Sequence, residues 1–190
     1  MKLKAGLLSF FLGAMSFLSQ ATESVVTLAG GKPVKLEGDR PAIQSNLPSF
    51  QFADLTFQPK QLEMYAGKTI VLGLVSSLDT GIGTLQLKEL DALAQKVDGD
   101  VAVIAITSDL PFAIKRVLKE ERIENIDVYS DALWHEAGHA FGVEIQYLGL
   151  MVSSLAVIDK EQKVAYLDVT QDLSKLPSIK GVEQFLGVQE

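Results

Sequence analysis

Short apolar runs alternate with amphipathic stretches along most of the chain. Near its start, Val25–Leu28 and Pro33–Leu36 flank a pair of glycines and predict a β-hairpin, because glycine adopts the positive φ of a tight turn without strain. Further along, Thr69–Val75 and Val101–Ile106 are apolar almost throughout. Such runs are typical of strands that are buried on both faces of a sheet.

Helical spacing appears between and after these strands. Apolar side chains recur every three or four positions in Leu87–Val97, and charges of alternating sign follow one face of Phe112–Arg122. Ser108 and Asp109 precede the second segment, so we expect them to cap its N-terminus. Ile179–Leu186 predicts a closing helix.

The remaining segments complete an alternation of strands and helices. Strands are predicted at Ile126–Tyr129, Leu155–Asp159 and Val164–Val169, with a short helix at Trp134–Ala140. A βαβαβ order followed by a hairpin and a terminal helix is that of an α/β sandwich of the thioredoxin type. We therefore expect one α/β domain with a central mixed sheet, helices on its faces and an N-terminal β-hairpin.

The first 21 residues have the pattern of a secretory signal peptide. Two lysines precede an apolar run from Ala5 to Leu18, and the small residues Ser19 and Ala21 follow it. A run of about 14 residues falls short of the ~20 that a membrane-spanning helix needs. Cleavage after Ala21 is thus favoured over a permanent anchor, which leaves residues 22–190 as a periplasmic or secreted domain.

Composition limits the partners of this domain. The whole chain has a formal net charge of −7, and removal of residues 1–21 takes away two lysines and no acid, which gives −9. An acidic surface does not attract nucleic acid or anionic lipid, so we expect neither of these partners and no membrane attachment after cleavage. The chain contains no cysteine. Disulfides and sulfur-based redox chemistry are therefore excluded, and we expect no cofactor.

Four motifs, in order, resemble one enzyme family. They are Ser76–Gly83, which contains Asp-Thr-Gly, then Asp109–Ala113, Ala140–Val143 and Val157–Asp159. These segments are similar to those of the thiol peroxidases, an atypical two-cysteine branch of the peroxiredoxins. The match covers essentially the whole mature chain. It implies a thioredoxin-like fold and a homodimer.

The resemblance also implies five functional positions, of which four are changed. The family motif Pro-x-x-x-Thr-x-x-Cys places its proline at Ser76, its threonine at Thr80 and its peroxidatic cysteine at Gly83. The resolving cysteine falls on or beside Leu118, and the peroxide-binding arginine falls near Ser153. Reduction of peroxide by this route needs a thiolate that becomes a sulfenic acid. We expect no such activity here, and Thr80 is explained more simply as a helix cap than as a catalytic residue.

The only two histidines form a second motif. His135, Glu136 and His139 match the HExxH pattern of zinc hydrolases, in which two histidines one helical turn apart bind the ion and the glutamate acts as general base. The extended motif expects a third ligand ten residues after His135, where the chain has Ile145, with Glu144 beside it. The interpretation that we favour is that both histidines face solvent or a partner.

Two functional hypotheses follow from these motifs. The first is a pseudoenzyme that keeps the thiol peroxidase fold and binds a protein or a small molecule, with the former active-site face near a dimer interface. The second is an enzyme with replaced chemistry, which would use a metal ion held by His135 and His139.

Overall fold

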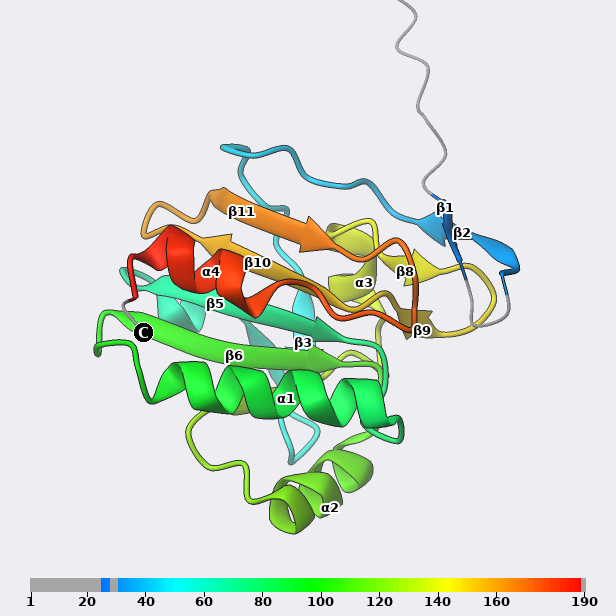
Figure 1. Cartoon of the computed structure of the whole chain (residues 1–190), viewed down its shortest axis with the longest axis horizontal. Coiled ribbons are helices and arrows are strands. Elements are labelled where there is room, and N and C mark those ends of the chain that lie inside the picture. The colour runs from blue at the N-terminus through cyan, green and yellow to red at the C-terminus, as the bar shows by residue number, and fades with distance from the viewer. Residues whose placement is uncertain (1–24, 28–30, 189–190) are drawn as a thin grey trace, which may run out of the picture.

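The computed structural model of the protein describes residues 25–27 and 31–188 (Figure 1). The predicted signal peptide and its cleavage site lie outside these residues. Within the described part of the chain, no helix has the length and apolar character needed to cross a membrane.

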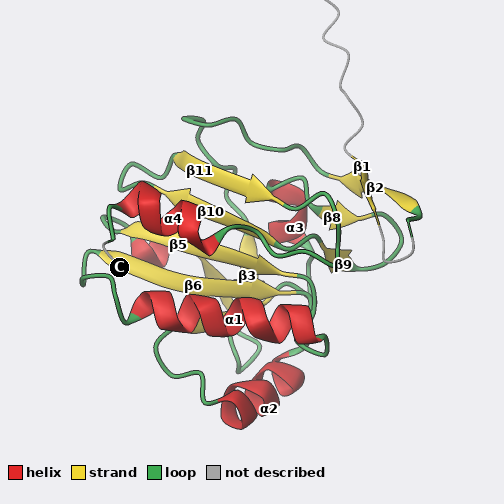
Figure 2. Ribbon diagram, viewed as in Figure 1, coloured by secondary structure: helices red, strands yellow, loops and turns green. Residues whose placement is uncertain are grey.

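A seven-stranded sheet forms the centre of the domain (Figure 2). Its strand order is β11-β10-β5-β6-β7-β3-β4. The pairs β5–β6 and β6–β7 are parallel and the other pairs are antiparallel, so the sheet is mixed, as the sequence predicts. The strands are β3 (Gln51–Ala53), β4 (Pro59–Gln61), β5 (Thr69–Val75), β6 (Val101–Thr107), β7 (Asp127–Ser130), β10 (Ser154–Ile158) and β11 (Val164–Val169).

Helices cover both faces of this sheet (Figure 1). One face packs against α1 (Gly81–Ala94), α2 (Pro111–Glu121) and α4 (Ile179–Leu186). The opposite face packs against the short helix α3 (Glu136–Ala140). Side chains of β5 alternate between the two cores, which explains why this strand is apolar throughout. A 3₁₀ turn, η1 (Leu62–Tyr65), precedes β5.

A second, four-stranded sheet contains the N-terminal hairpin. Its antiparallel order is β1-β2-β8-β9, so the hairpin pairs with a segment that follows α3. The hairpin is confirmed, whereas the sequence analysis missed the other two strands of this sheet, each of which is only two residues long. The strands are β1 (Val25–Thr27), β2 (Pro33–Glu37), β8 (Glu144–Ile145) and β9 (Leu150–Met151).

The predicted cap of α2 is wrong. Leu110 occupies the N-cap position and makes no capping hydrogen bond through its side chain, while Pro111 begins the helix. Proline suits this position because it has no N–H group to satisfy. Ser108 instead accepts a hydrogen bond from the Met151 backbone N–H at 3.1 Å, and the carboxylate of Asp109 turns toward the loop after β5.

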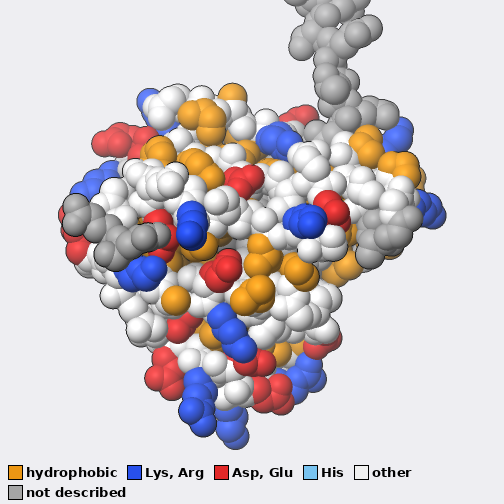
Figure 3. Space-filling model, viewed as in Figure 1, with side chains coloured by type: hydrophobic (Ala, Val, Ile, Leu, Met, Phe, Trp, Pro, Cys, Tyr) orange, Lys and Arg blue, Asp and Glu red, His pale blue; other side chains and the backbone are white. Residues whose placement is uncertain are grey.

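The exposed side of α2 is charged. Lysine, arginine and acidic side chains lie close together at the bottom of Figure 3, where this helix is found. Lys115, Arg116 and Lys119 are exposed, whereas Ile114 and Val117 are buried beneath them. The alternating charges of this segment therefore mark a solvated helix face.

Candidate functional site

The loop between β5 and α1 carries the segment that resembles a peroxidatic motif. Thr80 is the N-cap of α1, and its Oγ1 accepts a hydrogen bond from the Gly83 backbone N–H at 3.0 Å. The same hydroxyl donates to the carbonyl oxygen of Ser77 at 2.8 Å. Both bonds order the start of the helix, so the hydroxyl of Thr80 has the capping role expected from the sequence.

Gly83 has no room for a side chain. It is buried in the first turn of α1, and a Cβ atom added to it would overlap the carbonyl oxygen of Ser77. The same Cβ would also lie only 3.2 Å from Thr80 Oγ1. The place where a peroxidatic thiol would begin is thus filled by backbone, and restoring it requires the loop to move.

A carboxylate holds this loop. Asp109 accepts hydrogen bonds from the Leu78 backbone N–H at 2.6 Å, from Ser77 Oγ at 2.9 Å and from Thr107 Oγ1 at 2.6 Å. A nearby negative charge disfavours a thiolate, whereas a peroxidase needs the opposite. The sequence analysis missed this role. Since β5 and β6 are parallel neighbours, their carboxyl ends meet at one edge of the sheet. The predicted parallel order of these strands could therefore have indicated that Asp109 lies near the loop after β5.

The other three positions that the thiol peroxidase resemblance implies carry small or apolar residues. Ser76 directly follows β5 and is half-buried. Ser153 lies beside it at the same edge of the sheet, because Ser154 pairs with Leu74, and its carbonyl accepts hydrogen bonds from Thr170. Leu118 is half-buried on α2 and packs against the core. Topology therefore brings Ser76, Thr80, Gly83 and Ser153 to one end of the sheet, without a thiol or a guanidinium at any of them.

The HExxH segment does not form the arrangement of a zinc hydrolase. His135 has φ of 57° and precedes α3, so the two histidines do not both lie within the helix. The carboxylate of Glu136 accepts hydrogen bonds from the Gln51 backbone N–H at 2.8 Å and from Gln51 Nε2 at 2.9 Å. Glu136 thereby anchors α3 to β3 and is not placed as a general base for a bound water.

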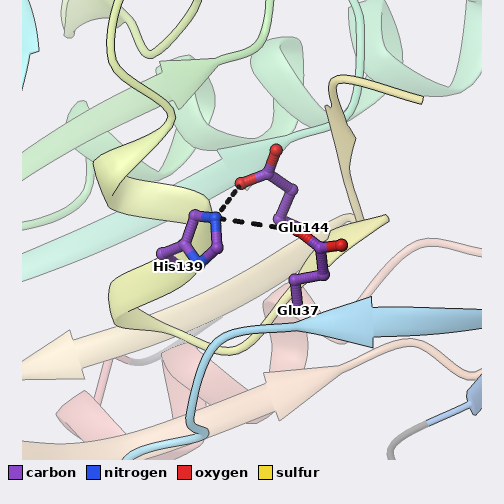
Figure 4. Close-up of side chains that lie close together, drawn as sticks. All are labelled: Glu37, His139 and Glu144. Atoms are coloured by element: carbon purple, nitrogen blue, oxygen red, sulfur yellow. Dashed lines mark ion pairs between the residues drawn. The ribbon is translucent and has the colours of Figure 1, made fainter. Parts of the chain in front are cut away.

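His139 lies instead between two carboxylates from other elements (Figure 4). Its Nε2 is 3.0 Å from Glu144 Oε2 and 3.9 Å from Glu37 Oε2. His135 approaches the other oxygen of Glu144, with 3.6 Å between its Nδ1 and Oε1. The sequence analysis noted Glu144 but not Glu37, which is distant in sequence and belongs to no recognisable motif.

Asp131 lies beneath the turn that carries these histidines. Its two carboxylate oxygens accept hydrogen bonds from the backbone N–H groups of Ala137 and Gly138, each at 2.9 Å. Burial nevertheless raises the pKa of this carboxyl to about 6, and the negative charge of Glu144 acts in the same direction. The turn therefore contains a carboxyl group that titrates near neutral pH.

A cleft of about 520 Å³ opens beside α3. Its lining includes Arg40, Phe50, Glu136 and His139. The cleft thus borders the histidine segment and is not the space around Gly83. A concave surface with a few polar groups is the usual form of a small-molecule site.

The sequence is similar to a known protein family and to curated members of it. A family profile described as Redoxin matches residues 42–186. A thiol peroxidase of Bacillus subtilis is 32% identical over 153 residues, which cover 80% of this chain and 90% of that protein. A thiol peroxidase of Campylobacter jejuni is 33% identical over 164 residues, covering 83% and 90% of the two chains.

Solved structures show the same likeness. A peroxiredoxin-like protein from Aquifex aeolicus superposes with a TM-score of 0.78 and 28% identity, and the match covers 86% of this chain and 95% of that one. A thiol peroxidase from Chromobacterium violaceum gives a TM-score of 0.75 at 22% identity with the same coverage. At 22% identity, the similarity to the Chromobacterium violaceum protein shows a shared fold and nothing more.

Proposed function

Since this chain belongs to the Redoxin family and to its thiol peroxidase group, we propose that it is an exported relative that has lost the peroxidase reaction and serves as a binding protein. The observation that supports this proposal most strongly is that position 83 has no side chain and no space for one. Gly83 offers no nucleophile, and the Ser77 carbonyl occupies the space that a side chain would need. With no cysteine anywhere in the chain, a sulfenic acid intermediate has no atom on which to form.

The surroundings of Gly83 support the same proposal. Asp109 brings a negative charge to the loop that would have to stabilise a thiolate. Arg116 is close to the loop, but its guanidinium pairs with Asp79 at 2.7 Å on the exposed surface. An exposed pair of this kind is weak and salt-screened, so it does not replace an arginine directed at a peroxide.

The binding role includes a homodimer. Phe112 is 69% exposed, packs against Phe57 with 5.0 Å between the centroids of the two tilted rings, and follows the exposed Leu110 by two positions. Asp109, which immediately precedes these residues, touches the loop of the former peroxidatic motif. We propose that this apolar surface is the dimer contact and that the domain functions in the periplasm or outside the cell after cleavage following Ala21.

The deciding experiment measures consumption of hydrogen peroxide and of an alkyl hydroperoxide by the purified mature protein with a thioredoxin-type reductant. The expected rate equals that of buffer, because no group can take the place of the thiolate. A catalytically active thiol peroxidase in the same assay serves as the positive control. Protein-dependent turnover would contradict the proposal and would show that a group other than sulfur reduces peroxide.

A further inference from the structure

Glu37 and Glu144 lie directly opposite each other across two antiparallel strands. They are register partners in the β2–β8 pair. Like charges in such cross-strand positions destabilise a sheet. A cation between the two carboxylates would convert this repulsion into attraction.

His139 places an imidazole nitrogen at the same point. Its Nε2 is 3.0 Å from Glu144 and 3.9 Å from Glu37, and the three ligand atoms all lie within 4.8 Å of one another. Ligands that are each roughly 2.1 Å from one ion are separated by about 3 to 4 Å. The three side chains therefore already stand at distances that a single metal ion requires, with only small adjustments.

The partly enclosed position of Glu144 supports a bound cation. Its side chain is only 13% exposed, and its buried Oε2 accepts no well-aligned hydrogen bond among the described residues, although His139 Nε2 lies 3.0 Å from it. A buried carboxylate oxygen without a donor is unfavourable unless a positive charge satisfies it. Glu37 and His139 are 36% and 50% exposed, so an ion can enter from solvent.

Gly38 holds the site together. It has φ of +86°, and a Cβ atom on it would overlap the backbone of His139. Only glycine allows the end of β2 to approach α3 so closely. The backbone thus brings Glu37 to His139 independently of any bound ion.

We infer that Glu37, His139 and Glu144 form a binding site for a divalent transition-metal ion. An imidazole with two carboxylates suits zinc and similar first-row ions better than calcium or magnesium, which prefer all-oxygen sites. The three ligands come from β2, α3 and β8, so the ion would fasten the N-terminal hairpin to the rest of the domain. Three protein ligands leave a coordination position for water or a small anion. This site uses neither Glu136 nor His135 and differs from the HExxH arrangement.

Calorimetric titration of the mature, chelator-treated protein with zinc chloride tests the inference. We expect one zinc ion per chain and a higher Tm in its presence. His139→Gln and Glu37→Gln should each weaken zinc binding by about tenfold or more, since even indirect support of a metal ligand is commonly worth that much. Glu37→Gln keeps the size of the side chain, and circular dichroism would verify that each variant is folded.

His135→Asn is the matched control. It removes the other histidine, and asparagine tolerates the left-handed backbone at this position. Zinc binding to this variant should stay within about threefold of the parent value, because His135 approaches the other oxygen of Glu144 and does not belong to the group formed by Glu37, His139 and Glu144. Equal loss in His135→Asn and His139→Gln would overturn the inference in favour of an HExxH site. Absence of stoichiometric zinc on the parent protein would overturn it outright and leave a His139–Glu144 ion pair only.

Discussion

The carbonyl oxygen of Ser77 occupies the space in which a side chain at Gly83 would begin. Thr80 fixes this arrangement, because its hydroxyl donates to the same carbonyl and accepts from the Gly83 N–H. The cap of α1 therefore leaves no space for a side chain at position 83.

Alanine substitutions in the first turn of α1 test this relationship. Gly83→Ala should lower the free energy of unfolding by about 1–3 kcal/mol, because the added methyl group overpacks against the Ser77 carbonyl. Gly81→Ala is the matched control, since a Cβ there meets nothing within 4 Å. It should raise stability by about 0.5–1 kcal/mol through helix propensity alone. Urea denaturation of both variants gives the comparison, and equal effects would show that the space at Gly83 is open.

A cysteine introduced at position 83 should not recover peroxidase activity. Gly83→Cys must first displace the loop, and its thiol then stands beside a loop segment that is bound to the Asp109 carboxylate. Because a helix N-terminus lowers the pKa of a thiol whereas a carboxylate raises it, we expect a thiol pKa close to the ordinary value of about 8.5, measured from the pH dependence of alkylation. Asp109→Asn in the same background should lower that pKa, because it removes the neighbouring negative charge. A pKa well below the ordinary value, or peroxide turnover, would contradict this prediction.

The sequence predicts the regular elements well and the contacts between distant segments poorly. The bounds predicted for β5 and α4 agree with the structure, since each has a strong apolar pattern. The start of α1 was placed at Leu87 and not at Gly81, because two glycines interrupt the apolar stripe in its first turn. β8 and β9 are too short for any pattern to identify.

The same distinction applies to the candidate sites. The positions that match the peroxidase motif follow from the local sequence, and the structure places four of them, Ser76, Thr80, Gly83 and Ser153, at one end of the sheet. The contacts of Asp109 with the loop and of Glu37 with His139 were not predicted, because Leu78 is 31 positions from Asp109 and His139 is 102 positions from Glu37, and only the folded topology brings them together. A local interpretation of Ser108 and Asp109 as caps failed for this reason.

The proposed dimer contact predicts a concentration-dependent effect of charge at Phe112. Phe112→Glu should weaken dimerisation by at least about tenfold, since a buried charge would replace an aromatic ring in the interface. Tyr147→Glu provides the control, because Tyr147 is 92% exposed but belongs to the turn between β8 and β9. Sedimentation equilibrium measures both. A monomeric parent protein, or equal loss in both variants, would rule out this surface as the contact.

Asp131 should make the stability of the protein depend on pH between about 4 and 6. Burial to 1% exposure raises its pKa to about 6 in the folded state, against about 3.9 in an unfolded chain. The folded protein therefore binds the extra proton in this range, so the free energy of unfolding falls as the pH rises from 4 to 7. Two units of pKa correspond to a contribution of about 2–3 kcal/mol.

The variant Asp131→Asn separates the contribution of Asp131 to the pH dependence of stability from the contributions of other titrating groups. Its amide stays neutral at every pH, so the stability of the parent relative to the variant should fall by about 2–3 kcal/mol between pH 4 and pH 7. Urea denaturation with a chelator present measures the difference at both pH values, and Asp79→Asn, at an exposed position, should show little change. A relative stability that rises with pH would mean that the N–H groups of Ala137 and Gly138 outweigh burial and hold the pKa of Asp131 low.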